Sequence, residues 1–229
     1  MNARSPQLPL DFKPLPAFDR AAFLVTESNA EAVAWIDKWP DWPAPALVLH
    51  GPPGSGKTHL ASVWRARANA GLVAGAALDA AAAPELAARH AALVIEPASA
   101  AAETALLHLY NMMAERRGHL LLVAATPPAR WPTRLPDLRS RLNALPVAEI
   151  AAPDDRLIRA VLIKLFADRQ VAVSPDIIDF LALRMERSFE VADRLVAAID
   201  ATALAGHRRV TVPLVRSVLE GLVTPPAEP

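Results

Sequence analysis

Hydrophobic residues gather in three short runs along the chain, and strands buried on both faces would produce such runs. The runs are residues 46–50, 92–95 and 120–124, and they consist almost entirely of alanine, leucine, isoleucine and valine. Apolar runs of this length, without an alternating polar face, are typical of strands in a covered parallel sheet. Two weaker runs, near 72–73 and at 146–150, predict two further strands.

Helical spacing fills the segments between these runs. In the segment 101–117, the side chains of Leu106, Leu109, Met112 and Met113 fall on one face. Shorter helices are predicted at 57–69, 84–89 and 137–142. Strands that alternate with helices indicate an α/β fold, in which helices cover both faces of a parallel sheet.

Another helix is predicted ahead of the first strand. The stretch Ser28-Asn29-Ala30-Glu31 has the pattern of a capping box, and apolar residues follow it at helical spacing as far as Trp39. Pro40 and Pro43 would end this helix because proline lacks the backbone donor that a helix interior needs.

After Pro153 the pattern changes to helices alone, which predicts a small all-helical domain. Four polar residues could cap the starts of these helices: Asp154, Ser174, Ser188 and Thr211. The predicted helices are 154–168, 175–186, 189–205 and 212–222. The expected division of the chain is an extended tail at 1–20, an α/β domain at 21–152, a helical domain at 153–223 and a disordered tail at 224–229.

Composition excludes several classes of protein. The chain has 229 residues, 53% of them hydrophobic, and no cysteine, so cysteine nucleophiles and disulfide scaffolds are excluded. The six histidines show no metal-ligand spacing. The formal net charge is zero, whereas a nonspecific nucleic-acid binder usually carries a basic surplus. The sequence has neither a signal-peptide core nor a membrane-spanning run, so we expect a cytoplasmic protein.

The strongest chemical motif directly follows the first strand. Residues 51–58 read GPPGSGKT and match the phosphate-binding loop (P-loop) G-x-x-x-x-G-K-[ST] at every specified position. Its glycines let backbone N–H groups surround phosphates, Lys57 reaches the β- and γ-phosphates, and the Thr58 hydroxyl can ligate Mg²⁺. The residues expected to bind nucleotide are Gly51, Pro52, Gly54, Ser55, Gly56, Lys57, Thr58 and His59. The alternative is a glycine-rich turn with a chance Lys-Thr pair.

Hydrolysis of ATP also needs acidic residues at the end of a neighbouring strand. Glu96 stands there and can serve the metal, but Pro97 occupies the place of the catalytic base and cannot accept a proton. Glu103 lies too far past the strand end to be a good candidate. Thr126, at the end of the next strand, could sense the γ-phosphate or simply cap a loop. We therefore expect nucleotide binding with weak or no intrinsic ATPase activity.

Four stretches stand out beside these motifs: 27–30 (ESNA), 56–60 (GKTHL), 106–111 (LLHLYN) and 135–142 (LPDLRSRL), the last followed by PDD at 153–155. Together they resemble AAA+ ATPases of the DnaA branch, and within it the Hda family of DnaA-homologous regulators. The resemblance spans residues 23 to about 222. The P-loop is generic, whereas the Ser-Asn and Arg-Ser-Arg elements are specific to the branch.

The resemblance implies a five-stranded parallel sheet with a helical lid domain, and ADP or ATP with Mg²⁺ between them. It also implies that Leu24 and Val25 lie near the adenine. Family lids usually present an arginine to the nucleotide, whereas Glu190 stands at the matching place here, with Arg187 and Arg194 nearby. The DNA-binding domain that follows the lid in DnaA has no counterpart in this sequence, so no direct sequence-specific DNA binding is expected.

The resemblance also suggests a use for the proline-rich tail, which its prolines keep extended. Gln7, Leu8, Leu10 and Phe12 resemble the short motif by which replication proteins dock on the DNA polymerase sliding clamp. The alternative is a tail that packs on its own domain.

In the same way, Arg141 matches the family's arginine finger, which acts in trans on a neighbour's ATP, while Arg139 would support the loop. A helix-end arginine in a surface ion pair is the alternative for Arg141.

These inferences predict a regulator of DNA replication initiation that docks on the clamp and promotes hydrolysis of DnaA-bound ATP. One alternative is a helicase-loader motor with its own ATPase cycle, and another is a module that binds nucleotide only for stability. The sequence leaves homo-oligomerisation open.

Overall fold

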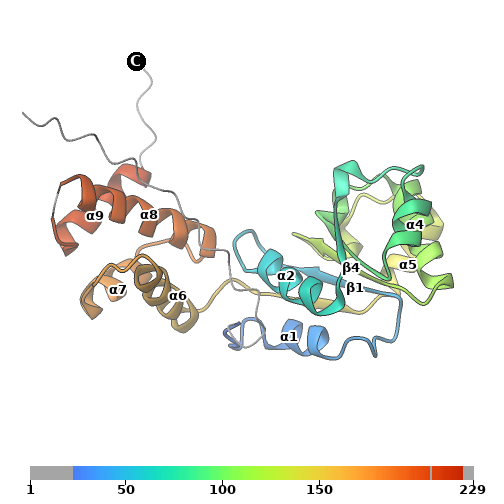
Figure 1. Ribbon diagram of the computed structural model, residues 1–229, viewed down its shortest axis with the longest axis horizontal. Helices are drawn as coiled ribbons and strands as arrows, with labels where there is room; N and C mark the ends of the chain where they lie inside the picture. Colours follow the sequence, from blue (N-terminus) through green and yellow to red (C-terminus); the bar gives the residue numbers. More distant parts are fainter. Residues whose placement is uncertain (1–22, 207, 224–229) are drawn as a thin grey trace, which may run out of the picture.

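A computed structural model of the chain describes residues 23–206 and 208–223. Over these residues the chain forms an α/β domain and a helical lid domain, which lie at the two ends of the molecule in Figure 1. The α/β fold and the all-helical C-terminal domain are thus as predicted.

The α/β domain contains one five-stranded sheet in the order β2-β3-β4-β1-β5, and every neighbouring pair is parallel. Both weak strand predictions are confirmed. The strands are β1 (Ala46–His50), β2 (Gly71–Ala74), β3 (Ala92–Glu96), β4 (His119–Ala124) and β5 (Val147–Glu149).

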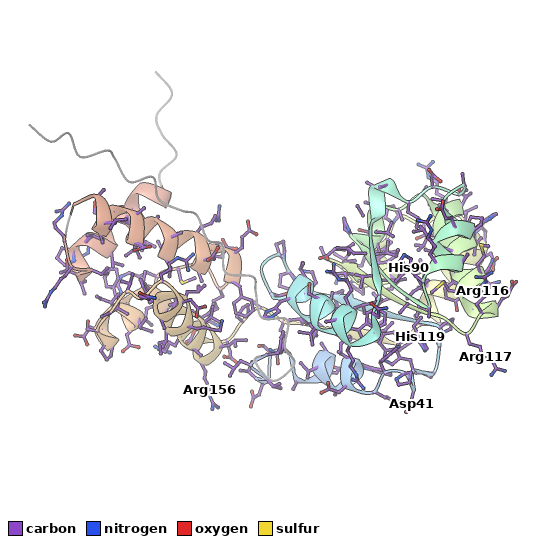
Figure 2. The ribbon with its side chains drawn as sticks, viewed as in Figure 1. Asp41, His90, Arg116, Arg117, His119 and Arg156 are labelled. Carbon is purple, nitrogen blue, oxygen red and sulfur yellow. The ribbon has the colours of Figure 1, made fainter. Side chains whose placement is uncertain are left out.

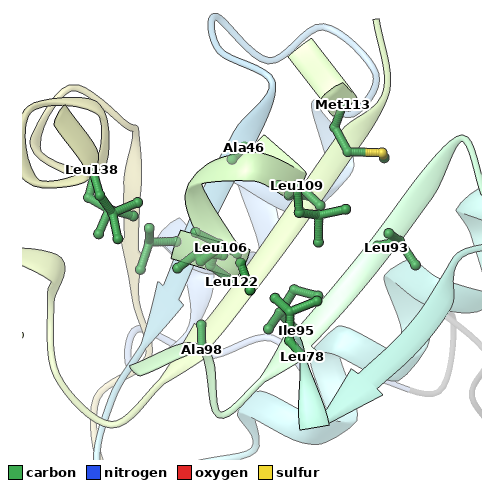
Figure 3. Close-up of a cluster of buried hydrophobic side chains, with 14 of the residues drawn as sticks. Ala46, Leu78, Leu93, Ile95, Ala98, Leu106, Leu109, Met113, Leu122 and Leu138 are labelled. Carbon is green, nitrogen blue, oxygen red and sulfur yellow. The ribbon is translucent and has the colours of Figure 1, made fainter. Parts of the chain in front are cut away.

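Helices cover both faces of this sheet because successive strand residues point to opposite sides. On one face, Leu47 and Leu49 of β1 share a core with the first two helices, whereas Ala46 and Val48 face the next three. Figure 3 shows this second core, in which Leu106 and Leu109 pack over Leu122. The helices are α1 (Ala30–Asp37), α2 (Lys57–Ala68), α3 (Ala83–Arg89), α4 (Glu103–Glu115) and α5 (Pro136–Asn143).

In the described part of the α/β domain, short 3₁₀ helices complete the connections. They are η2 (Gly75–Ala77), η3 (Ala98–Ala100) and η4 (Pro128–Arg130).

The lid domain has a core of its own, centred on Leu162, Phe166, Leu195 and Ile199. Asp154 and Ser188 cap their helices with side-chain hydrogen bonds as predicted, but Ser174 makes no such bond. The lid helices are α6 (Asp155–Asp168), α7 (Pro175–Ala182), α8 (Phe189–Ala205) and α9 (Val212–Val223). Helix α7 is shorter than predicted, because the chain turns after Ala182 toward the start of α8.

The predicted capping box before α1 is wrong. Asn29 occupies the N-cap position but makes no capping hydrogen bond. Its Oδ1 accepts the N–H of Thr26 at 2.9 Å, and its Nδ2 donates to the carbonyl of Leu24 at 3.0 Å. The buried amide therefore ties the preceding turn together instead of capping the helix.

An aromatic cluster closes the end of the sheet at which the strands begin. Trp42 stacks on Trp64 with ring centroids 5.3 Å apart, and Trp39 contacts Trp64 edge to face at 6.0 Å. His119, labelled in Figure 2, starts β4 and contacts Trp39 at 5.9 Å. The opposite end of the sheet, where the strands finish, carries the P-loop.

Replacement of Leu109 by alanine tests the core between α4 and the sheet. The side chain is fully buried, so Leu109→Ala should lower the free energy of unfolding by about 2–5 kcal/mol. Leu204, which is 71% exposed on α8, supplies the control: Leu204→Ala should change it by less than about 0.5 kcal/mol. Urea unfolding followed by circular dichroism measures both. Equal effects of the two substitutions would contradict the assigned core.

Candidate nucleotide-binding site

The P-loop joins β1 to α2, and three of its glycines adopt positive φ. The angles are 156° at Gly51, 68° at Gly54 and 100° at Gly56. The last two lie in a region that other residues rarely adopt. A Cβ on Gly51 would lie only 2.0 Å from the carbonyl oxygen of Ile150. The loop conformation therefore depends on glycine at these positions.

The two reactive side chains of the motif meet other parts of the loop and the sheet. Lys57 Nζ donates to the Pro52 carbonyl at 2.7 Å, and Thr58 Oγ1 donates to Glu96 Oε1 at 2.6 Å. Burial lowers the pKa of Lys57, and the Glu96 carboxylate opposes that change. The structure thus brings together the predicted phosphate ligand and both predicted metal ligands.

The loop has the features that a nucleotide phosphate with Mg²⁺ requires. The Ser55 hydroxyl is buried and has no hydrogen-bond partner among the described residues. Backbone N–H groups at the start of α2 and the Lys57 ammonium suit phosphate oxygens, and the hard oxygen donors of Thr58 and Glu96 suit Mg²⁺. Within residues 23–206 and 208–223, no cluster of three or more His, Asp or Glu side chains forms another metal site.

A cavity of about 550 Å³ lies between the two domains, beside the P-loop. Leu24 lines it, whereas Val25 is exposed and outside the lining. That the two residues lie near the adenine stays a prediction. The rings of Phe23 and His59 meet edge to face at 5.3 Å on the same side. The cavity is lined by residues of both domains. They include Gly54, Gly56, Lys57, Thr58 and His59 from the P-loop region, and Leu157, Ala160, Val161, Lys164 and Leu165 from the lid.

The lid makes direct contact with the P-loop, which sequence reasoning did not predict. The backbone N–H of Phe189, at the start of α8, donates to the Gly54 carbonyl at 2.9 Å. A Cβ on Gly54 would lie 1.9 Å from Ser188 Oγ, and one on Gly56 would lie 2.9 Å from the Phe189 ring. The first turn of α8 therefore sits on the two glycines that flank Ser55.

The lid brings charges of both signs to the cavity. Its lining includes Glu190, Asp193 and Lys164, but not Arg187 or Arg194. Arg187 instead pairs with Asp155 at 2.7 Å. The family's lid arginine therefore has no direct counterpart in this cavity.

Glu103 has a structural role. Its carboxylate accepts the backbone N–H groups of Arg134 and Leu135, the latter at 2.7 Å. These two hydrogen bonds lower the pKa of Glu103. That Glu103 is not the catalytic base stays a prediction. Thr126 is exposed, and its carbonyl accepts the indole N–H of Trp131 at 2.9 Å.

Arg139 and Arg141 have different surroundings on α5. Arg139 donates to the Thr133 carbonyl through Nε at 3.1 Å and also through its terminal nitrogen. Arg141 pairs with Asp137 at 3.1 Å, and its side chain is 39% exposed. Neither arginine lines the chain's own cavity. Arg139 supports the loop as expected, and Arg141 remains accessible.

The four residues of the predicted clamp motif, Gln7, Leu8, Leu10 and Phe12, lie outside the described residues. Within those residues, every helix is too short or too polar to cross a lipid bilayer.

Comparison with known proteins finds a family model and curated proteins that are similar to parts of this chain. The family model described as "Hda, lid domain" matches residues 155–219. The chromosomal replication initiator protein DnaA of Cutibacterium acnes is 24% identical over 116 residues, which is 51% of this chain. The match covers 23% of the initiator, so this chain aligns with about a quarter of that relative's length.

Solved structures share the fold at low sequence identity. Domain III of the Thermotoga maritima replication initiation protein DnaA superposes with a TM-score of 0.78 and 15% identity, over 92% of this chain and 99% of that domain. AMPPCP-bound DnaA from Aquifex aeolicus gives a TM-score of 0.69 with 16% identity, over 84% of this chain and 68% of that one. These matches confirm the predicted sheet and helical lid.

Replacement of Lys57 by alanine should remove the main positive partner of the phosphates. Loss of one member of a buried charge pair costs about 2–5 kcal/mol, so Lys57→Ala should weaken nucleotide affinity by about thirtyfold or more. Calorimetry with ADP and ATP in the presence of Mg²⁺ measures the affinity. Lys38→Ala, on an exposed lysine just after α1, is the control and should bind as wild type does. Equal affinity of Lys57→Ala and wild type would exclude the assigned phosphate site.

Proposed function

We propose that this chain, which resembles AAA+ proteins of the DnaA/Hda branch, regulates replication initiation by promoting hydrolysis of DnaA-bound ATP. In this proposal it binds ADP or ATP with Mg²⁺ in the cavity beside Lys57. It docks on the sliding clamp through its N-terminal tail, and it presents Arg141 to the nucleotide of DnaA.

One combination of features carries the proposal. Thr58 Oγ1 lies 2.6 Å from Glu96 Oε1, which suits the metal-binding role proposed for both residues, yet Pro97 stands where a catalytic base is needed. Arg141, in contrast, lies on α5, does not line the cavity beside the P-loop, and is partly exposed. A site that favours binding over turnover, together with an accessible arginine, suits a protein that acts on a neighbour's nucleotide.

The chemistry of the finger explains what a neighbour would gain. Negative charge develops on the γ-phosphate and its bridging oxygen during hydrolysis, and a guanidinium from an adjacent subunit stabilises it. Mg²⁺, if held here, would supply positive charge beside the phosphates. Thr58 and Glu96 would hold this metal, while Lys57 would hold the phosphates.

The clamp-docking part of the proposal depends on a few anchor side chains. In such motifs the apolar residues fill a pocket, and a glutamine adds a hydrogen bond beside it. A second function, a helicase-loader motor, would require fast turnover by the chain itself. Pro97 opposes that alternative, and multiple-turnover ATPase assays with single-stranded DNA would detect it.

The tail is tested by replacing Phe12 with alanine in a clamp-binding assay. Loss of a buried aromatic anchor removes about 2–3 kcal/mol, so the affinity for the purified clamp should fall by at least about thirtyfold. Gln7→Ala should weaken binding less. Phe18→Ala, in the same tail but outside the motif, is the matched control and should bind normally. If Phe12→Ala binds the clamp as tightly as wild type does, the docking proposal is wrong.

The finger is tested by replacing Arg141 with alanine. An arginine finger is worth about a thousandfold or more in rate, so the variant should lose nearly all acceleration of DnaA-bound ATP hydrolysis on clamp-loaded DNA. Nucleotide and clamp binding should be unchanged. Arg89 forms a similar pair with Glu85, four residues before it on α3, so Arg89→Ala is a matched control that should retain acceleration. Equal rates for Arg141→Ala and wild type would place the catalytic arginine elsewhere.

A further inference from the structure

The structure places side by side two residues from separate sequence motifs. The guanidinium carbon of Arg141 lies 5.5 Å from the centroid of the Tyr110 ring. Tyr110 belongs to the LLHLYN stretch of α4, and Arg141 belongs to the LPDLRSRL stretch that forms α5. The proposed function uses Arg141 and gives Tyr110 no role.

Arg141 is held on two sides, and the two contacts differ in kind. The Asp137 carboxylate lies on the same helix, four residues earlier, and its side chain is 59% exposed. Such an exposed pair orders an arginine only weakly. The Tyr110 ring is partly buried against the core and belongs to another helix. An aromatic face attracts a guanidinium within about 6 Å, so the ring gives Arg141 a fixed surface to lie on.

Helix α4 also fixes the segment that carries Arg141. Glu103, in the first turn of α4, binds the N–H groups of Arg134 and Leu135 directly before α5. Tyr110 follows Glu103 by about two helical turns and lies on the same face. Leu106 lies between them on that face and shares the core of Figure 3 with Leu138 of α5. One face of α4 therefore contacts α5 at three places: Glu103 binds the backbone before α5, Leu106 packs in the same core as Leu138, and Tyr110 contacts Arg141.

We propose that Tyr110 is a positioning residue that pre-orders Arg141, with Glu103 fixing the helix on which Arg141 stands. This inference rests on the proposed function, because it concerns how the finger reaches a neighbour's triphosphate. An arginine that swings freely in solvent loses side-chain entropy when it engages a phosphate. The ring removes part of that loss before the partner arrives, and it limits the directions in which the guanidinium can extend.

The first experiment needs no partner protein. The Nε–H resonance of Arg141, assigned by its absence in Arg141→Ala, is compared by nuclear magnetic resonance in wild type, Tyr110→Phe and Tyr110→Leu. Wild type and Tyr110→Phe should show an ordered, ring-shifted signal, because both keep the ring. In Tyr110→Leu the chemical shift of the Arg141 Nε–H resonance should move toward the value of a mobile, solvent-exposed arginine. An unchanged signal in Tyr110→Leu would overturn the proposal.

The second experiment separates positioning from folding and from docking. The rate of DnaA-bound ATP hydrolysis is measured against the concentration of each variant. Tyr110→Leu should lower the saturating rate by about threefold to tenfold and leave the half-saturating concentration unchanged, while Tyr110→Phe should keep the wild-type rate. Glu103→Gln keeps one of the two side-chain oxygens that accept the N–H groups of Arg134 and Leu135, and loses the other. This variant should also lower the saturating rate, because the start of α5 is then held less firmly. A change in the half-saturating concentration alone, or no change with Tyr110→Leu, would overturn the proposal.

The two experiments also distinguish this inference from the proposed function. If wild type and Arg141→Ala accelerate hydrolysis equally, the finger assignment fails. The resonance of Arg141 then still decides whether Tyr110 orders it.

Discussion

Gly54 meets two requirements at once. Its φ of 68° gives the P-loop the curvature that a phosphate needs, and its carbonyl accepts the N–H of Phe189 from the lid. A side chain at this position would collide with Ser188. The conformation of the P-loop and the seating of α8 are therefore set by the same backbone atoms, and the cavity between the domains exists because the lid rests there.

This arrangement separates two tasks within one small protein. The cavity lies at the end of the sheet where the strands finish, between the P-loop and helices α6 and α8. Arg141 is on α5, contacts Tyr110 of α4 and does not line that cavity. Bound nucleotide would stabilise the contact between the domains, since it would touch both. The surface of α5 would remain available to a partner.

Much of the fold could be predicted because the strands of a sheet covered on both faces must consist mainly of apolar residues. Every residue of β1 is buried, so the run at 46–50 had to be almost wholly apolar. The edge strand β2 alternates partly buried and exposed positions, and its weaker pattern follows from having only one neighbour. The P-loop was predictable because all of its chemistry is local.

The contacts between distant segments could not be predicted in this way. No local pattern indicates that Phe189 meets Gly54, or that Glu103 binds the backbone before α5, because each depends on how whole elements pack. Asn29 shows the limit even at short range. Its sequence context fits a capping box, yet its amide bonds the backbone of Leu24 and Thr26, which a pattern of residue types does not distinguish.

The aromatic cluster at the start of the strands has an optical consequence. All five tryptophans and the single tyrosine fall between residues 35 and 131, within the α/β domain. The lid contains neither residue, so the absorption and emission of tryptophan and tyrosine come from the α/β domain alone. Trp42 and Trp64 stack at 5.3 Å, which makes their emission sensitive to loosening of that end of the sheet. The lid, invisible at these wavelengths, would accept a single introduced tryptophan as a reporter of its own movement.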